Sequence, residues 1–332
     1  MKTLKILLSV VLFVLCVSAF ACTWGSYTTK DGSETMTVRT MDWMIDDHPV
    51  VMGTPRGMKV RAYTGENPME YTSKYAYIKV KSFGIATADG VNEKGLTYSI
   101  LFLYQSETAP VKPELKNVAM TQYGDYILAN FATVEEALKS EDINVVVDPS
   151  ERILPGLTDR KEGFPLHVAL SDATGDRVVI EMVDGKMKIY HGKEYCAMSN
   201  DPEYKIQLYM DMAKYQPGYS IESINRRARI LYYMKDCDAR GVTGKTRTLM
   251  NMEKMIQKTY AGPDELDPVA NAPYPTLWSV INDLKNPSVY FKYYQSWNTV
   301  YYDFKSFDVN GKEPVELKSK TPPARDDYEI KG

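Results

Sequence analysis

Cys22 follows a segment that resembles a secretory signal, and this position constrains the 332-residue chain more than any other feature. Residues 1–21 begin with two lysines, continue with a largely apolar run and end with small residues at Ala19 and Ala21. A signal peptidase that recognises these two small residues would leave Cys22 as the first residue. We therefore expect an exported protein, periplasmic or secreted, with residues 1–21 as a signal peptide and residues 22–332 as one domain.

A cysteine at the first position of a chain carries both a thiol and a free α-amine. Their ordinary pKa values, about 8.5 and about 7.7–8.0, allow the amine to accept the thiol proton near neutral pH. This pairing is a self-contained nucleophile and base, and it predicts an N-terminal nucleophile hydrolase. Two other interpretations stay open: a bacterial lipid anchor, which would block both groups, and an ordinary structural cysteine. Ala19 disfavours the lipid anchor, since the lipoprotein signal prefers Leu, Val or Ile at that place.

Composition and charge exclude several classes of partner. A hydrophobic content of 44%, with 25% charged residues, is typical of a soluble globular protein. The net charge is −3 and there is no dense Lys/Arg stripe, so we expect no nucleic-acid partner. After residue 17 no apolar run is long enough for a membrane span. Loss of residues 1–21 would leave Cys22, Cys196 and Cys237, and a disulfide between the last two stays open.

The periodicity of apolar residues predicts an α+β fold with antiparallel sheets and helices layered on them. Residues 23–29 and 36–41 predict a hairpin that would bring Cys22 close to Arg39 and Asp42. The further strands expected are 75–80, 96–103, 167–171, 178–183, 186–190, 277–281, 289–294 and 299–304, and the helices are 120–131, 134–140, 203–214, 222–235 and 248–259. A charged tail from about residue 313 is expected on the surface.

Three sequence patterns that would indicate another kind of site, for phosphate, for a metal or for a cysteine–histidine dyad, are weak. Residues 241–246 resemble a phosphate loop, but Ala239 takes the place of its first glycine. The three histidines are scattered without ligand spacing, so we expect no metal and no organic cofactor. A papain-type dyad of Cys22 with His167 is less favoured than a plain strand histidine.

Two charged residues of the hairpin have two interpretations each. Asp42 could hold the α-ammonium of Cys22 for proton transfer, or it could simply end a turn. Arg39 could support a charge network around the nucleophile, or pair on the surface.

Six ordered segments resemble the choloylglycine hydrolase/penicillin V acylase family, in particular its exported branch in Gram-negative bacteria. The segments are 22–23, 39–43, 89–96, 166–181, 198–202 with Gln207, and 226–229. The resemblance implies an αββα four-layer sandwich, with two antiparallel sheets between helical layers. It also implies hydrolysis of linear, non-peptide amide bonds, no cofactor and a homotetramer.

The resemblance assigns roles to seven residues of this chain. They are Cys22 (nucleophile and base), Asp42 (orientation of the amine), Arg39 (support of the thiolate), Asn200 (oxyanion donor), Arg226 (the late active-site arginine), and Trp43 and Phe102 (substrate pocket). Phe102 stands where one branch has Asn or Tyr, so a second oxyanion donor is not identified. Arg227 replaces a common phenylalanine, which makes Arg229 the alternate for Arg226. Trp43 fits a plain core role equally well.

These observations predict an exported hydrolase that cleaves a small-molecule N-acyl amide through an acyl-Cys22 intermediate. Within the family the substrates include conjugated bile salts, penicillin V and N-acyl homoserine lactones. The loops expected at 46–63 and 144–164 carry no readable specificity code. The alternative is a lipid-anchored or secreted binding protein with the same fold and no turnover.

Overall fold

The computed structural model describes residues 22–63, 65–140, 143–147, 155–156, 164–212, 218–267, 271–294, 296 and 298–319. The expected signal peptide over 1–21 lies outside the described residues, as do most of the loop 144–164 and the end of the charged tail. Within the described part of the chain, no helix is long and apolar enough to cross a membrane.

The first sheet has six antiparallel strands, with the N-terminal hairpin and β15 at its centre. The hairpin forms because two strands of alternating residues flank a short polar turn with Gly32 at φ 69°. In spatial order the strands are β14 (Ala197–Ser199), β1 (Thr23–Thr28), β2 (Thr35–Asp42), β15 (Thr276–Asp283), β16 (Ser288–Tyr293) and β17 (Val300–Asp303).

The second sheet has eight antiparallel strands and packs face to face on the first. In spatial order its strands are β13 (Lys186–His191), β12 (Arg177–Val183), β11 (Leu166–Ser171), β8 (Thr97–Phe102), β7 (Ala86–Asn92), β6 (Tyr77–Ser82), β3 (Val50–Thr54) and β18 (Val315–Glu316). Two small sheets stand apart, an antiparallel one of β4 (Lys59–Arg61) with β5 (Glu70–Thr72) and a parallel one of β9 (Lys116–Ala119) with β10 (Ile143–Val146).

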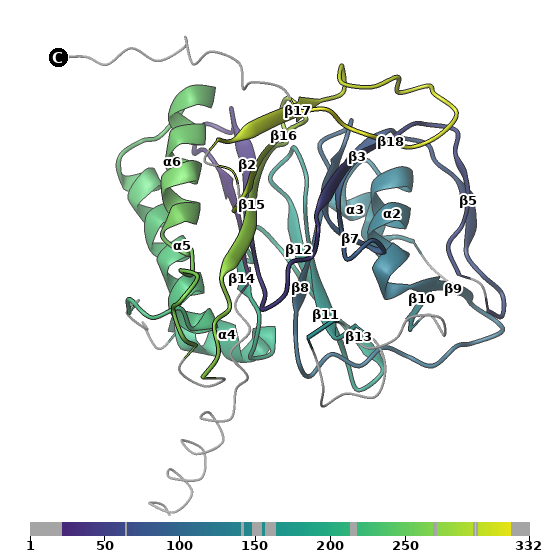
Figure 1. Cartoon of the computed structure of the whole chain (residues 1–332), viewed down its shortest axis with the longest axis horizontal. Helices are drawn as coiled ribbons and strands as arrows, with labels where there is room; N and C mark the ends of the chain where they lie inside the picture. Colours follow the sequence, from purple (N-terminus) through teal and green to yellow (C-terminus); the bar gives the residue numbers. More distant parts are fainter. Residues whose placement is uncertain are drawn as a thin grey trace, which may run out of the picture.

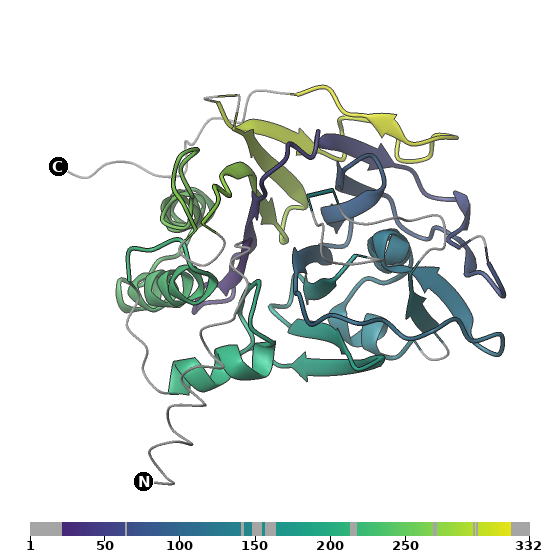
Figure 2. The same cartoon turned by 60° about the horizontal axis from the view of Figure 1, so that its bottom comes forward.

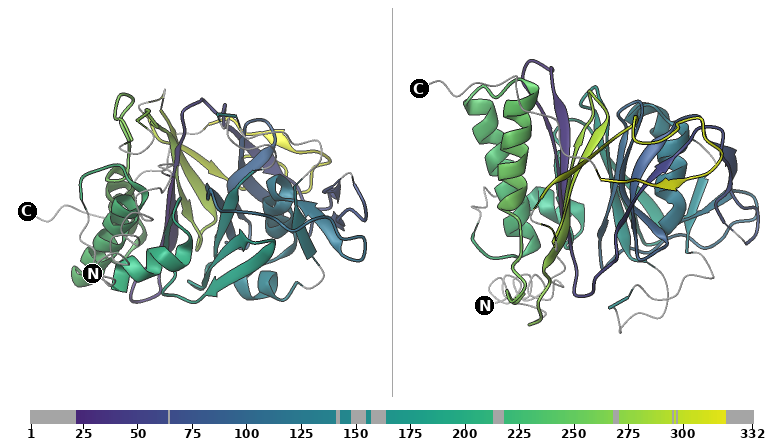
Figure 3. Two further views of the ribbon diagram at one scale, coloured as in Figure 1. Left: turned by 90° about the horizontal axis from the view of Figure 1, so that it is seen from below. Right: turned by 45° about the horizontal axis from the view of Figure 1, so that its top comes forward.

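Helices cover the outer faces of both sheets, so the predicted αββα arrangement is confirmed (Figures 1 and 3). The helix α5 (Ser223–Ala239) and α6 (Lys245–Gln257) lie on the first sheet, and α2 (Met120–Asn130) with α3 (Val134–Leu138) lies on the second. The short helix α4 (Tyr204–Met212) follows β14 at one end of the first sheet (Figure 2).

The predicted hairpin, strands and helices correspond to observed elements, with ends that differ by a few residues. The helix predicted over 222–235 continues to Ala239. The predicted capping box is present, because the Thr133 side chain accepts a hydrogen bond from Glu136 N at the start of α3.

Two segments expected as loops contain strands, and these two predictions were wrong, whereas the tail lies largely on the surface as expected, as far as residue 319. The segment 46–63 holds β3, which is part of the second sheet, and β4. The segment 144–164 begins within β10. The tail from residue 313 holds the two-residue strand β18, which pairs with β3 and is followed by buried Leu317. These strands are short or exposed, so they lack the apolar alternation that makes a strand visible in a sequence.

The hairpin packs unusually closely against α5 at Gly25. A Cβ atom at this glycine would lie 2.7 Å from Ile230 Cγ2 and 2.9 Å from Met234 Cε. Both distances are shorter than a normal carbon contact, so the absence of a side chain allows the helix to approach the strand. This approach sets the distance between the hairpin and the middle of α5.

We predict that Gly25→Ala lowers the free energy of unfolding by about 1–3 kcal/mol, because the added methyl group overpacks the strand–helix contact. Urea denaturation measures the change. The double variant Gly25→Ala/Ile230→Val removes one of the crowded methyl groups and should recover part of the loss. Equal stability of Gly25→Ala and the wild type would show that α5 can shift freely.

Candidate active site

Cys22 lies at the end of β1, between the ends of two neighbouring strands. The register that pairs Thr23 with Thr40 and with Ser199 places Met41 on one side of Cys22 and Asn200 on the other. Its Sγ lies 3.5 Å from the Asp42 backbone nitrogen and 3.9 Å from Met41 Sδ. The residue is buried, with 2% of its surface exposed. The thiol is therefore held by the backbone that leads into Asp42.

The Asp42 carboxylate is fully buried and is held by three side chains. Arg226 Nη2 of α5 lies 2.9 Å from Oδ2, and the Thr40 hydroxyl donates to the same oxygen at 2.6 Å. The Thr276 hydroxyl of β15 donates to Oδ1. Burial raises the pKa of Asp42, and the Arg226 guanidinium and the two hydroxyls act in the opposite direction. Loss of Arg226 would leave a buried carboxylate without its cation, at a cost of about 3–5 kcal/mol.

Arg39 places a second buried guanidinium near the thiol, on the side that faces the second sheet. Its Nη2 donates to the Ile100 carbonyl oxygen at 2.8 Å, and its Cζ lies 4.4 Å from the centroid of the Trp278 ring. Its Nε and Nη1 have no hydrogen-bond partner. Burial raises the pKa of the Cys22 thiol, and the positive charge of Arg39 acts against that rise. Arg39 therefore favours the thiolate.

Asn200 directly follows β14 at the position opposite Cys22. Its side chain is fully buried, yet among the described residues neither its nitrogen nor its oxygen has a hydrogen-bond partner. A buried amide without partners is uncommon and requires an explanation. An oxygen atom of a bound substrate would satisfy it.

A small apolar cavity of about 40 Å³ opens beside the thiol. Trp43 and Phe102 form one wall, with ring centroids 5.6 Å apart, and Trp43 Nε1 donates to the Pro155 carbonyl at 2.7 Å. Its complete lining is Cys22, Arg39, Met41, Trp43, Ser82, Phe83, Ala86, Ala88, Ile100, Leu101, Phe102, Phe164 and Leu166. The volume holds roughly two or three waters, so an acyl group enters only if lining side chains move.

The structure shows where each of the seven predicted site residues lies. The structure brings Cys22, Arg39, Asp42, Asn200 and Arg226 together and places Trp43 and Phe102 on the cavity. Their roles stay predictions. The alternate, Arg229, instead donates to the carbonyls of Gly218 and Ser220. His167 pairs with Glu181, and among the described residues no cluster of side chains could hold a metal ion.

A sequence model of the choloylglycine hydrolase family, described as linear amide C-N hydrolases, matches residues 22–229. The chain belongs to the choloylglycine hydrolase family. The matched segment runs from residue 22 to residue 229. It therefore includes most of the residues that meet at Cys22, among them Arg226.

Two curated relatives match this chain over about half of their own length. A penicillin V acylase from Pectobacterium atrosepticum is 34% identical over 214 residues, which are 60% of this chain and 56% of that protein. A bile salt hydrolase/transferase from Clostridium perfringens is 28% identical over 197 residues, which are 55% and 54% of the two chains. The chain thus spans about half the length of the curated relatives it matches.

Solved structures with the choloylglycine hydrolase fold match more of the chain. The penicillin V acylase from Agrobacterium tumefaciens gives a TM-score of 0.76 at 25% identity and covers 88% of this chain and 90% of its own. A mutant conjugated bile acid hydrolase from Clostridium perfringens gives 0.74 at 19% identity, over 90% and 96%. The second likeness shows the fold alone.

Three residues of this choloylglycine hydrolase site were missed in the sequence. Thr40 lies inside the motif that carries Arg39 and Asp42, but no role was assigned to it. Thr276 and Trp278 lie on β15, far from the hairpin in the sequence, and a register shift in the pairing of β15 with β2 falls between them. No local pattern marks these two residues as neighbours of Asp42 and Arg39.

A second buried carboxylate, Asp89, lies between the sheets and was noted only as part of a motif. Its oxygens accept hydrogen bonds from the Ser99 hydroxyl at 2.5 Å and from Asn282 Nδ2 at 2.8 Å. Burial raises the pKa of Asp89 to about 6, although the positive charge of Arg39 and these hydrogen bonds oppose the rise. Arg39 is thus shared electrostatically between Cys22 and Asp89.

This pKa gives a prediction for stability against pH. The carboxyl of Asp89 is neutral in both states below pH 4, and between about pH 4 and 6 only the unfolded chain releases its proton. The contribution of Asp89 to the free energy of unfolding therefore falls as the pH rises through this window, by about 3 kcal/mol. In Asp89→Asn, which keeps the size and an acceptor for Asn282, this loss should disappear. Urea denaturation at pH 4.5, 6 and 8 measures it, and parallel curves for the two proteins would contradict it.

Proposed function

We propose that this chain hydrolyses a linear N-acyl amide through its residue Cys22, once that residue is the first of the mature protein. One observation carries the proposal: Cys22 Sγ borders an apolar cavity and also lies 3.5 Å from the backbone nitrogen of Asp42, whose carboxylate pairs with Arg226. A thiol between a small apolar cavity and a buried charge network has the setting of an activated nucleophile. Membership of a family of linear amide C-N hydrolases supports the same activity.

The proposed reaction has two halves. Cys22 Sγ attacks the amide carbonyl carbon while the α-amine of Cys22 takes the thiol proton, and the negative charge moves to the carbonyl oxygen. The tetrahedral intermediate collapses, the C–N bond breaks, and the leaving amine receives the proton from the α-ammonium. Water then attacks the thioester, gives a proton through the same amine to the returning sulfur, and releases the carboxylic acid.

The surrounding residues have separate tasks in this proposal. Asn200 Nδ2, which has no hydrogen-bond partner, donates to the oxyanion. Asp42 orients the α-ammonium, and Arg226, Thr40 and Thr276 act against the rise in its pKa that burial causes. Arg39 favours the thiolate before the attack.

The cavity indicates the chemical nature of the acyl group. Apart from Arg39 and Ser82, its lining is apolar, and the rings of Trp43 and Phe102 form one wall. An acyl part without charge matches this apolar lining, and it enters once the lining side chains move. Penicillin V, conjugated bile salts and N-acyl homoserine lactones remain the candidates, and the greater identity to a penicillin V acylase favours the first.

The test is release of amine from penicillin V, glycocholate, taurocholate and an acyl homoserine lactone by the purified protein that begins at Cys22. We expect turnover of at least one substrate and its complete loss in Cys22→Ala. Mass spectrometry of the quenched reaction should find one acyl group on Cys22. A free N-terminal Cys22 with no turnover of any substrate would favour the binding protein, and a lipid mass on Cys22 would exclude this mechanism.

A second prediction concerns the amine alone. We propose that export provides the cut before Cys22, and that residues 1–21 direct it. One glycine inserted between Ala21 and Cys22 keeps the thiol but moves the amine away from it, so activity should fall to the level of Cys22→Ala. N-terminal sequencing controls for trimming. Full activity with the glycine verified in place would exclude the α-amine as the base.

A further inference from the structure

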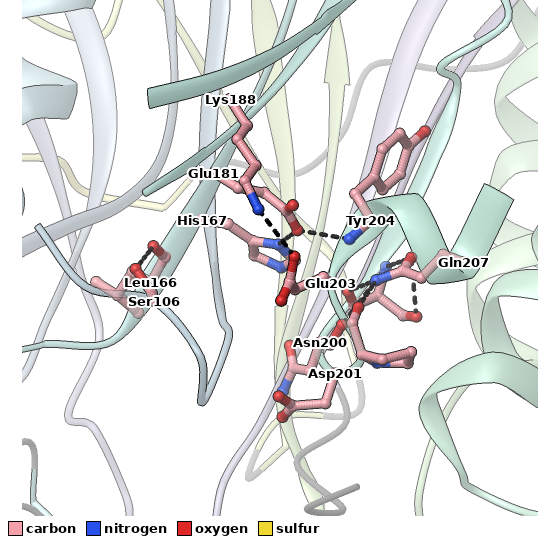
Figure 4. A network of polar contacts seen from close by, with 12 residues as sticks. Ser106, Leu166, His167, Glu181, Lys188, Asn200, Asp201, Glu203, Tyr204 and Gln207 are labelled. Atoms are coloured by element: carbon pink, nitrogen blue, oxygen red, sulfur yellow. Dashed lines mark hydrogen bonds and ion pairs between the residues drawn. The ribbon is translucent and has the colours of Figure 1, made fainter. Parts of the chain in front are cut away.

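The turn that carries Asn200 encloses one side-chain nitrogen. Gln207 Nε2, from α4, lies 2.8 Å from each of three backbone carbonyl oxygens, those of Ser199, Asn200 and Pro202. Its Oε1 accepts a hydrogen bond from Ser199 N at 3.2 Å. Figure 4 shows the Gln207 side chain directed into this turn, beside Asn200. Gln207 is 1% exposed, so water does not replace these bonds.

The three carbonyl oxygens need a donor between them. Their partial negative charges converge on one buried point and repel one another, and buried carbonyls without donors cost free energy. A primary amide has two N–H groups and one acceptor oxygen, so it can serve the three carbonyls by sharing and still accept from Ser199 N. An apolar side chain of the same size could fill the space but could not hold the turn.

The direction of the Asn200 side chain depends on this turn. No hydrogen bond holds either of its side-chain polar atoms, and its residue is fully buried. The position of its amide is therefore set by its backbone, which Gln207 holds at Asn200 O and on both sides. Across the strand, the pairing of Thr23 with Ser199 fixes the same backbone relative to Cys22.

The first turn of helix α4 is held by a hydrogen bond to β12, so the position of Gln207 on this helix is fixed. Tyr204 N donates to Glu181 Oε1 at 2.7 Å, and the Glu181 carboxylate also meets His167 in a fully buried pair (Figure 4). From α5, Arg227 Nε donates to the Ala197 carbonyl of β14 at 3.0 Å and its Nη1 contacts Asp211 near the end of α4. The strand before Asn200 and the helix after it are thus joined.

We propose that Gln207 is a positioning residue, which aims the Asn200 amide at the carbonyl oxygen of the substrate by holding the turn from Ser199 to Pro202. The inference rests on the proposed function, since it assigns Gln207 a task in that reaction. A donor acts on the oxyanion only when it is in place before the attack, and a misplacement of about 1 Å can lower the rate about a hundredfold. Gln207 therefore affects the rate of the chemical step rather than the binding of substrate.

A double-mutant cycle separates this role from a general effect on the fold. Gln207→Leu should lower kcat about tenfold to a hundredfold with KM changed less than about threefold. Asn200→Ala should lower kcat about a hundredfold to a thousandfold. In the Asn200→Ala background, Gln207→Leu should have less than about a twofold further effect, because the group that it positions is gone.

The controls keep the outcome clear. Lys205→Gln changes an exposed residue of the same helix and should leave kcat unchanged. Circular dichroism shows whether each variant is folded. If Gln207→Leu does not fold, Gln207→Glu replaces it: its carboxylate cannot donate to the three carbonyls, but its protonated form can donate to one. The ratio of its kcat to that of the wild type should therefore rise as the pH falls, which removes the common effect of the α-amine.

Each outcome of the double-mutant cycle either supports or overturns the positioning role of Gln207. Equal losses in both backgrounds, or an unchanged kcat in Gln207→Leu, would overturn the positioning role while the wild-type turnover upholds the proposed function. Absence of wild-type turnover on every substrate would overturn the proposed function, and this inference with it.

Discussion

The buried ion pair of Asp42 with Arg226 is the interaction on which the site depends. It joins the end of β2 to α5, and Thr276 adds β15, so one carboxylate connects the centre of the first sheet to the helices that cover it. Among the described residues Arg226 Nε and Nη1 have no hydrogen-bond partner, so the guanidinium depends on Asp42 for the compensation of its buried charge. The same contact therefore ties the position of the helical layer to the position of the Asp42 carboxylate.

The alternation of side chains along β2 places its two charged site residues on opposite faces of the sheet. On β2, Arg39 points toward the second sheet and the apolar cavity, whereas the Asp42 side chain points toward α5. Cys22 stands at the edge between them, where its thiol reaches the cavity and its backbone lies against Asp42. The cavity and the charged pair therefore lie on opposite sides of β2.

Much of the fold was visible in the sequence, because most of its elements have a strong apolar period. The hairpin alone brought Cys22, Arg39 and Asp42 together, since its register follows from a short turn. The contacts of Thr276 and Trp278 were not visible, because they depend on which distant strand lies beside β2 and on a register shift. The short strand β18 was missed because two exposed residues carry no period. The three carbonyls around Gln207 are main-chain geometry, which no residue pattern shows.

The pairing of the first strands with β15 also has a consequence for the order in which the protein is made. Translation delivers Cys22 and the N-terminal hairpin early, while the strand that fills the middle of their sheet and brings Thr276 to Asp42 follows much later in the chain. Until then the edge of β2 has no neighbour, and the carboxylate lacks one of its donors. A nascent chain that stops short of β15 thus holds every residue of the N-terminal hairpin without a completed site. The completed surroundings of Asp42 thus require β15, and folding must close a long chain loop to bring it there, which is slow.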